Sequence, residues 1–263
     1  MTGSDFDAIK PFDVEKVTED VTRSWYEGEG ATNPYEGDSE PHYTDLNDDG
    51  TLKSEGKYSW VKAPRYDGLP MEVGPVARML IGYTKDSKSI TPYMQQFMDD
   101  TAMTLQDFDT TVGRNAARAV EAQVCCAATF EYMNDLIENI KYYDEETWTK
   151  SDFDELPTTA QGQTFYEGTC GVLSHVVRIE AAKITNSQVV APPTWNASPK
   201  DAKDLRGPYE EALIGLELKD SSQPLEVLRV VHSFDPCLAC AVHVIDLKGV
   251  EISRYKINAA CGI

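Results

Sequence analysis

Apolar residues recur at helical spacing in two stretches of the chain. Both stretches lie after residue 75, and neither contains a proline. Residues 76–83 and 110–143 carry Ala, Leu, Met and Val with the period of about 3.6 residues that places them on one face of a helix. We expect two or more helices here, the second of them long and largely buried. Further helices are predicted near residues 208–215 and over about 224–232, just before a cysteine-rich segment.

The strand signals are fewer. Residues 172–180 and 184–191 are rich in β-branched side chains and are separated by a short turn, which predicts a β-hairpin. Residues 1–60 contain many turn-forming residues, so we expect an irregular, loop-rich segment that packs on the surface of a larger fold. A polar connection is expected over 152–157, and a loop after Pro192-Pro193.

Composition narrows the choice of class and partner. A chain of 263 residues with 41% hydrophobic content can bury a sizeable core, although a piece of a larger fold would leave part of that core exposed. The net charge of -20 argues against nucleic acid or an anionic membrane surface as a direct partner. No run of 18 apolar residues and no export signal is visible, so we expect no direct membrane span. The 6 cysteines do not resemble a disulfide scaffold and are better interpreted as ligands and buried thiols.

A Cys-x-x-Cys-x-x-His cluster lies close to the end of the chain. Two residues between Cys237 and Cys240 let both thiolates turn toward one point, and the imidazole of His243 can reach the same region. This arrangement is typical of a soft transition-metal site. A lone redox Cys-x-x-Cys or half of a zinc site are the alternatives, but the adjacent pair Cys125-Cys126 is poorly spaced to supply the rest of a zinc site.

The residues around this cluster, His-Ser-Phe-Asp-Pro-Cys-Leu-Ala-Cys-Ala-Val-His at 232–243, resemble the C-terminal signature of the large subunit of nickel-iron hydrogenases. Segments 16–25, 65–78, 194–203 and 206–215 resemble other blocks of the same family, in family order. The resemblance implies the C-terminal half of that fold, of the respiratory uptake class, mainly α with small β elements (α+β). Family large subunits also carry an N-terminal Arg-x-Cys-Gly-x-Cys-x-x-x-His motif, which supplies two further nickel thiolates and which this sequence does not contain.

The resemblance assigns roles to the motif residues. It implies that Cys237 is a terminal nickel thiolate, that Cys240 bridges nickel and iron, and that His243 binds a nearby magnesium ion. The iron would carry cyanide and carbon monoxide ligands. Heterolytic splitting of dihydrogen needs a soft metal and a basic thiolate that takes the proton, which a metal-bound cysteine provides. Asp235 either orders the approach to the site or forms a simple turn with the proline that follows it.

Two departures from the family pattern fall in the pocket expected around the iron ligands. Cys170 stands where the family has an arginine in Glu-Ala-Pro-Arg-Gly, and a thiol cannot supply the positive fork of a guanidinium. Pro193 replaces a serine or threonine and has neither a hydroxyl nor an N–H group to donate. The residues expected to line this cofactor pocket are Cys170, Leu173, Ala191, Pro192 and Pro193. An altered surrounding of a working centre, a decaying paralogue, and an extra ligand or redox thiol at Cys170 all stay open.

The resemblance also sets expectations for domains. Residues 1–243 would form one incomplete domain, and residues 244–263 resemble the extension that a maturation endopeptidase removes after nickel insertion. An ordinary terminal strand is the alternative for this tail, because residues 250–257 alternate between apolar and polar side chains.

The expected partners are an iron-sulfur small subunit and a chain that supplies the N-terminal half with the missing cysteine pair. This chain has too few cysteines for a cluster relay of its own. We therefore expect a hydrogenase that is inactive as an isolated chain, cytoplasmic as a precursor, and periplasmic or on the outer face of the cytoplasmic membrane when mature, exported with a partner's signal. The alternative is a truncated, non-catalytic homologue that acts as an assembly or interaction piece.

Overall fold

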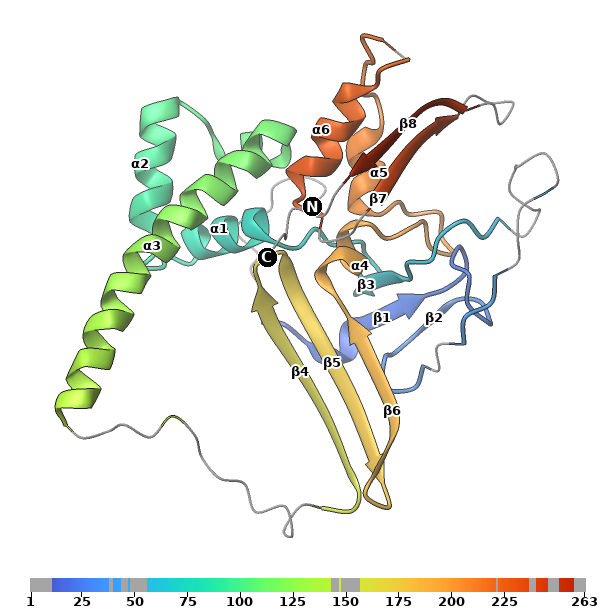
Figure 1. Cartoon of the computed structure of the whole chain (residues 1–263), viewed down its shortest axis with the longest axis horizontal. Coiled ribbons are helices and arrows are strands. Elements are labelled where there is room, and N and C mark those ends of the chain that lie inside the picture. The colour runs from blue at the N-terminus through green and yellow to red at the C-terminus, as the bar shows by residue number, and fades with distance from the viewer. Residues whose placement is uncertain are drawn as a thin grey trace.

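The computed structural model of the chain places helices at one side of an irregular centre and a long antiparallel sheet below it (Figure 1). It describes residues 11–37, 40–43, 47, 56–142, 147, 157–220, 222–236, 240–245 and 251–257, the last two ranges by their backbone alone. The connection expected over 152–157 lies outside these residues except at Pro157.

Three helices form the helical part. They are α1 (Pro75–Thr84), α2 (Thr91–Thr101) and α3 (Thr111–Lys141), with a 3-10 turn, η2 (Leu105–Asp109), before α3. The Thr110 side chain begins α3 by accepting a hydrogen bond from the backbone N–H of Gly113 at 3.0 Å. A Cβ on Gly113 would come within 2.1 Å of the carbonyl oxygen of Asp107, so only glycine lets α3 pack this closely on η2. The helices bury one core cluster, made of Val76, Met79, Leu80, Met94, Phe108, Ala116, Ala117 and Val120.

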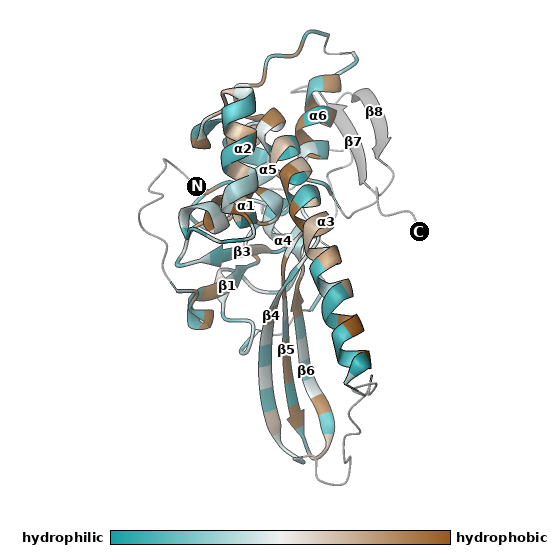
Figure 2. Ribbon diagram, turned by 90° about the vertical axis from the view of Figure 1, so that its left-hand side faces the viewer, coloured by the Kyte–Doolittle hydropathy of each residue, from teal (hydrophilic) through white to brown (hydrophobic). Residues whose placement is uncertain are grey.

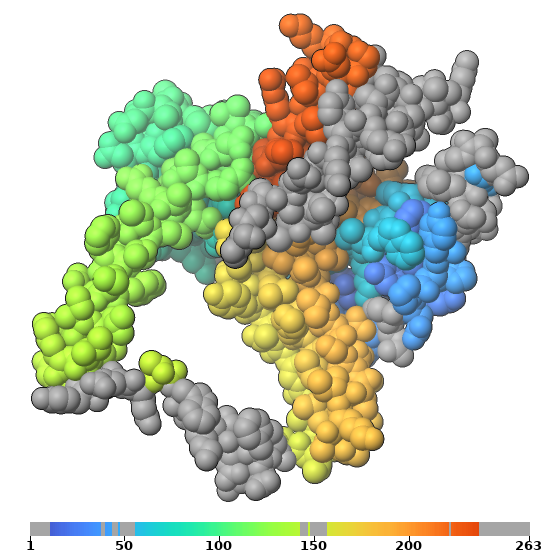
Figure 3. Space-filling model, viewed as in Figure 1, coloured from blue at the N-terminus to red at the C-terminus, as the bar shows by residue number. Residues whose placement is uncertain are grey.

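The length predicted for α3 is confirmed, but its predicted burial is wrong. The buried residues of α3 all lie in its first ten positions, Val120 being the last. Beyond them the helix extends past α1 and α2, which cover only its beginning, and stands clear of the described chain (Figure 3). Large side chains on this far half are 46–70% exposed, and Figure 2 shows brown, hydrophobic bands among teal ones along this part of α3. The exposed side chains are Phe130, Tyr132, Met133, Leu136, Ile137 and Ile140.

This contrast predicts different costs for the same substitution at two methionines. Met94 is 0% exposed, whereas Met133 is 54% exposed. Met94→Ala should lower the free energy of unfolding by about 2–5 kcal/mol, because it leaves a cavity in the helical core. Met133→Ala should change it by less than about 0.5 kcal/mol. Urea denaturation of the two variants measures both values, and equal losses would mean that the far half of α3 is packed in solution.

The long sheet consists of β4 (Ala160–Gly168), β5 (Gly171–Glu180) and β6 (Lys183–Val190), in that order and antiparallel. The predicted hairpin is β5–β6. Strand β4 was not predicted from the sequence, because Ala-Gln-Gly-Gln-Thr-Phe-Tyr-Glu-Gly is mostly polar and shows no alternation.

The loop predicted after Pro192-Pro193 begins instead as a short helix, α4 (Pro192–Asn196). Proline is tolerated in the first turn because the N–H groups there have no partner within the helix. The backbone N–H of Ala197 donates to the carbonyl oxygen of Pro193 at 2.8 Å and closes the turn. Helix α4 packs against β5 and against β3 of the N-terminal sheet.

The N-terminal part is irregular, as expected. Its strands are β1 (Val17–Asp20), β2 (Ala31–Thr32) and β3 (Ala63–Tyr66), in the order β2-β1-β3, with a short 3-10 turn η1 (Val14–Lys16) ahead of them. The ammonium group of Lys57 holds the long loop after β1. It lies 3.0–3.1 Å from the carbonyl oxygens of Val21, Ser24, Tyr26 and Gly28.

The remaining helices lie where the sequence predicted them, whereas a strand at the cysteine motif was not predicted. Helices α5 (Pro208–Leu213) and α6 (Leu225–Ser233) lie where helices were predicted. Strands β7 (Cys240–Ile245) and β8 (Glu251–Ile257) form an antiparallel pair, so the alternation in the tail corresponds to a strand. Within the described ranges, no helix has the length and apolar character needed to cross a membrane.

Candidate functional site

The predicted metal ligands lie near the end of the chain. Cys237 is outside the described residues, while Cys240 and His243 fall in β7, where only the backbone is described. In the part of the chain that the structure describes, no group of three His, Cys, Asp or Glu side chains could hold a metal ion. The ligand set of the motif therefore stays a prediction, and the structure describes what surrounds it.

Helix α6 delivers the chain to the motif. The backbone N–H of Asp235 donates to the carbonyl oxygen of His232 at 3.0 Å and closes the last turn of the helix. Asp235 has a φ of 55°, in the left-handed region that often ends helices. Phe234 is 5% exposed, so this turn is packed against the body. Asp235 thus lies in the turn that ends α6.

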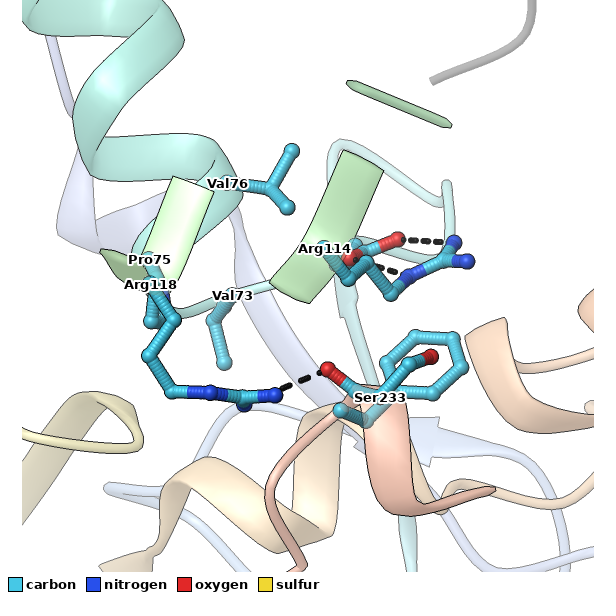
Figure 4. Close-up of a pocket in the computed structure, with 8 residues that line it drawn as sticks. Val73, Pro75, Val76, Arg114, Arg118 and Ser233 are labelled. Carbon is cyan, nitrogen blue, oxygen red and sulfur yellow. Dashed lines mark hydrogen bonds and ion pairs between the residues drawn. The ribbon is translucent and has the colours of Figure 1, made fainter. Parts of the chain in front are cut away.

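Arg114 of α3 holds this turn from one side. The carbon of its guanidinium group lies 4.0 Å from the centre of the Phe234 ring, a cation–π contact. The same guanidinium donates two hydrogen bonds, of 2.8 and 2.7 Å, to the carboxylate of Glu72 (Figure 4). Arg114 therefore joins the segment before α1 to the residues that lead into Cys237.

Arg118, one helical turn further along α3, contacts the same turn. Its Nη1 donates to the carbonyl oxygen of Ser233 at 3.3 Å, and lies 4.0 Å from Oδ2 of Asp235. Figure 4 shows both arginines beside one pocket, with Arg118 reaching toward Ser233 and Arg114 paired with a carboxylate. The pocket is lined by Glu72, Val73, Pro75, Val76, Arg114, Arg118, Ser233 and Phe234.

The residues predicted to line the cofactor pocket meet at one end of the long sheet. Cys170 lies in the turn between β4 and β5, where Gly168 pairs with Gly171. Ser174 of β5 pairs with Val190 of β6, so the beginning of β5 lies beside the end of β6. This register brings the turn and Leu173 to the same end of the sheet as Ala191, Pro192 and Pro193.

The segment Val73-Gly74 connects this end of the sheet to the arginine pocket. The side-chain amide of Asn196 in α4 accepts from the backbone N–H of Val73 and donates to its carbonyl oxygen, both at 2.9 Å. A Cβ on Gly171 would come within 2.6 Å of Cγ2 of Val73, which also lines the pocket. Val73 therefore lies between the turn that carries Cys170 and the turn that leads into Cys237.

Two buried donors at this end of the sheet lack a partner in the described chain. The hydroxyl of Ser174, which is 0% exposed, and the indole N–H of Trp195, which is 2% exposed, make no hydrogen bond within the described residues. Buried polar groups are nearly always paired, so such groups fit a place where an acceptor is supplied from outside. The thiols and the imidazole of the motif can bind a metal ion. Together with the two unpaired hydrogen-bond donors, they are compatible with a metal centre whose other ligands accept hydrogen bonds.

Sequence reasoning missed the residues that hold these turns. Arg114, Arg118 and Asn196 were not singled out, although two arginines four residues apart in an alanine-rich helix are a visible signal. Such spacing puts both guanidinium groups on one face. Besides the nearby side chains of Asn115 and Asp109, their partners include backbone groups and a carboxylate that are distant in the sequence, which no local pattern reveals.

Residues 1–243 match the family pattern of the nickel-dependent hydrogenases, and the chain belongs to this family. It is 43% identical, over 97% of its length, to the large chain of the quinone-reactive Ni/Fe-hydrogenase of Wolinella succinogenes. It is also 39% identical, over 94% of its length, to the uptake hydrogenase large subunit of Rhizobium leguminosarum bv. viciae. These alignments cover 46% and 43% of the two relatives, so the chain spans less than half the length of either.

Solved structures give the same family. A reduced, active form of the Ni-Fe-Se hydrogenase from Desulfomicrobium baculatum is similar in structure, with a TM-score of 0.67 and 31% sequence identity. The superposition covers 87% of this chain and 45% of the Desulfomicrobium baculatum chain. The resemblance to the large subunit and the α+β fold class are thereby confirmed.

Proposed function

We propose that this chain is the nickel-binding, C-terminal part of a hydrogenase large subunit, and that the assembled protein catalyses the reversible oxidation of dihydrogen to protons and electrons. The observation that carries the proposal is the family match, which runs to residue 243 and so includes the whole Cys-x-x-Cys-x-x-His motif. Alignment with the large chain of a quinone-reactive Ni/Fe-hydrogenase over 97% of the chain supports it.

In this proposal Cys237 and Cys240 contribute two of the four nickel thiolates, and His243 binds a magnesium ion. A nickel-iron centre held by these residues, with cyanide and carbon monoxide on its iron, would supply the soft metal that polarises dihydrogen. The thiolate of Cys237 takes the proton, because a metal-bound cysteine stays deprotonated and keeps a lone pair. Asp235, held in its turn beside Arg118, orders the approach of the chain to Cys237.

Cys170, Leu173, Ala191, Pro192 and Pro193 line the side of the centre that carries the iron ligands. Their position at one end of the sheet supports this role. Because Pro193 has no N–H and Cys170 no guanidinium, fewer donors face this side than the family pattern provides. The unpartnered hydroxyl of Ser174 is a donor that could serve in their place.

Three partners complete the proposed enzyme. An iron-sulfur small subunit takes the electrons, since large subunits of this family work with such a partner. The other cysteine pair comes from sequence outside these 263 residues, here assigned to a chain that supplies the N-terminal half. A maturation endopeptidase is the third. The mature protein is placed at the periplasm or the outer face of the cytoplasmic membrane, and the precursor in the cytoplasm.

We assign residues 244–263 to the extension that the endopeptidase removes, with 1–243 as the domain that remains. The end of the family match at residue 243 supports this boundary. Strand β8 lies within the extension and pairs with β7, Cys240 opposite Ile257 and His243 opposite Arg254. Removal of the extension after nickel insertion would free the backbone of the two motif residues from this pairing, so that the new chain end can fold inward and close the site.

Metal analysis tests the proposal. The 263-residue chain purified alone should contain no stoichiometric nickel or iron and oxidise no hydrogen, whereas the chain purified with its partners should contain both metals. In the assembled protein, Cys240→Ser should remove nickel, because a thiolate ligand is lost. Cys126→Ser is the matched control, since Cys126 lies exposed on α3 and should leave nickel content unchanged. Stoichiometric metal and activity in the isolated chain would contradict the division of the site between two pieces.

A non-catalytic interaction piece is the second candidate. The exposed apolar residues on the far half of α3 favour it, because contiguous apolar surface marks a place where another protein binds. In that case the chain should co-purify with maturation factors and without metal.

A further inference from the structure

The side chain of Arg78 in α1 makes hydrogen bonds both to the β4 end and turn that carry Cys170 and to α3. It donates to the carboxylate of Glu167 at 2.8 Å and to the carbonyl oxygens of Gly168 and Thr169 at 2.8 and 2.7 Å. Its remaining two N–H groups bind the carboxylate of Glu121 in α3. All five donors of the guanidinium are therefore used, and the turn is tied through Arg78 to α3.

The charge on Arg78 is secure. Burial works against it, since the side chain is 19% exposed, but the hydrogen bonds and charges of Glu121 and Glu167 outweigh burial and raise the pKa of Arg78 above its usual value. The guanidinium is therefore positively charged at neutral pH.

Two glycines bring the same turn against the start of α1. A Cβ on Gly74 would lie 3.0 Å from the carbonyl oxygen of Cys170, and one on Gly171 would lie 2.9 Å from the backbone nitrogen of Gly74. Their φ values of 120° and 134° are reached readily only by glycine. The position of Cys170 is consequently set by backbone contact on one side and by Arg78 on the other.

On α3, Glu121 belongs to a stripe of charged residues. Arg114, Arg118 and Glu121 are spaced i, i+4, i+7, so they share one face of the helix. Glu121 reaches the Cys170 turn through Arg78, and Arg118 reaches the carbonyl oxygen of Ser233. One face of α3 therefore contacts both the Cys170 turn and the turn after α6. The contacting residues of α3 lie within seven positions of one another.

We infer that this stripe of α3, linked by Arg78, is a positioning frame that fixes the Cys170 turn relative to the chain entering Cys237. Its relevance to a bound centre rests on the proposed function, whereas the frame itself is a property of the metal-free chain. The arginines and Glu121 are positioning residues, since they act through the two turns.

The frame is tested by the alkylation rate of Cys170 in the full, metal-free chain, measured for each cysteine by mass spectrometry with iodoacetamide. In Arg78→Met the turn loses its charge-assisted hydrogen bonds and opens more often, so the rate at Cys170 should rise about tenfold. The rates at Cys125 and Cys126, exposed on α3, should not change. Arg206→Met is the matched control, because Arg206 pairs with Glu211 at the surface.

Arg78→Lys separates positioning from charge. Lysine keeps the positive charge but cannot reproduce the fork that binds Glu121 and two carbonyls together. The alkylation rate of Cys170 should therefore stay high in Arg78→Lys, even if the urea denaturation midpoint of this variant returns to that of the unsubstituted chain. Glu121→Gln should raise the alkylation rate of Cys170 by a smaller factor. Glu138→Gln should leave this rate unchanged, because Glu138 pairs with Lys141 at the surface of the same helix.

An unchanged rate at Cys170 in Arg78→Met would overturn the inference. A rise at Cys170 that only matches the increase in the globally unfolded fraction, measured by urea denaturation, would overturn it too, because Arg78 would then stabilise the whole fold and not this turn. Neither result depends on nickel, so either can be told apart from a failure of the proposed hydrogenase function.

Discussion

Arg65→Met is expected to lower the free energy of unfolding by about 3–5 kcal/mol, because it leaves a buried carboxylate without its counter-charge. Arg65 in β3 donates to Oδ2 of Asp201 at 2.7 Å, and the two side chains are only 2% and 5% exposed. Arg65 also donates to the carbonyl oxygens of Pro199 and Leu205, at 3.1 and 2.8 Å. Since residues 198–205 follow α4, the pair fixes the helix that carries Pro193. Urea denaturation near neutral pH measures the loss.

Arg206→Met is the control for this variant as well. Its pair with Glu211 is 38% and 64% exposed, so its loss should cost less than about 1 kcal/mol. Arg65→Met combined with Asp201→Asn should recover part of the stability, because no unpaired charge then remains. Equal losses for Arg65→Met and Arg206→Met would show that the buried pair contributes no more than a surface pair.

The same pair predicts an acid dependence. Burial alone would raise the pKa of Asp201, but hydrogen bonds from Arg65 and from the backbone N–H groups of Leu205 and Lys203 outweigh it and lower the pKa. A carboxyl group whose pKa is lower in the folded than in the unfolded chain stabilises the fold at any pH above the unfolded-chain pKa. This contribution is lost as the pH falls below about 4. Arg65→Met should show less of this acid dependence, because it removes the contribution of Arg65 and leaves the two backbone hydrogen bonds.

Cys170→Arg is expected to raise the rate of hydrogen oxidation by the nickel-loaded, assembled enzyme about 100-fold, if the proposed function holds. A guanidinium at this position supplies a fixed positive donor where the family pattern has one, and a preorganised donor in a dry site is worth about that factor. The nearby charge of Arg78 does not oppose the change, because Glu121 and Glu167 both pair with it. The measurement is kcat for hydrogen oxidation with an artificial acceptor, at equal nickel content.

Companion variants separate the three explanations for Cys170. Cys170→Lys should gain less than Cys170→Arg, because an ammonium lacks the planar fork. If Cys170→Ser and Cys170→Arg both lose nickel, the thiol is a ligand, and the expectation of a gain is wrong. If neither change alters a rate that is already at background, a decaying paralogue is supported.

The sequence predicted some elements well and others poorly, for physical reasons that differ between them. Helices α1, α5 and α6 are short and each begins at a proline or directly after one, so local sequence signals were sufficient. Strand β4 was missed because it is held by pairing with β5 and not by its own pattern. The burial of α3 was overestimated because its far half has the apolar residues of a buried helix, although no described element covers them.

For the candidate site, the sequence by itself determined the chemistry: two thiols and an imidazole at chelating spacing, and the family to which the chain belongs. It also located the two departures, Cys170 and Pro193, because ligand and donor chemistry depends on residue type. Only the tertiary structure decided that both departures lie at one end of a sheet, and that α3 holds the turns on either side of Val73. Hydrogen bonds from an arginine to distant backbone carbonyls leave no local sequence pattern, since any residue can offer a carbonyl and only the fold brings it within reach.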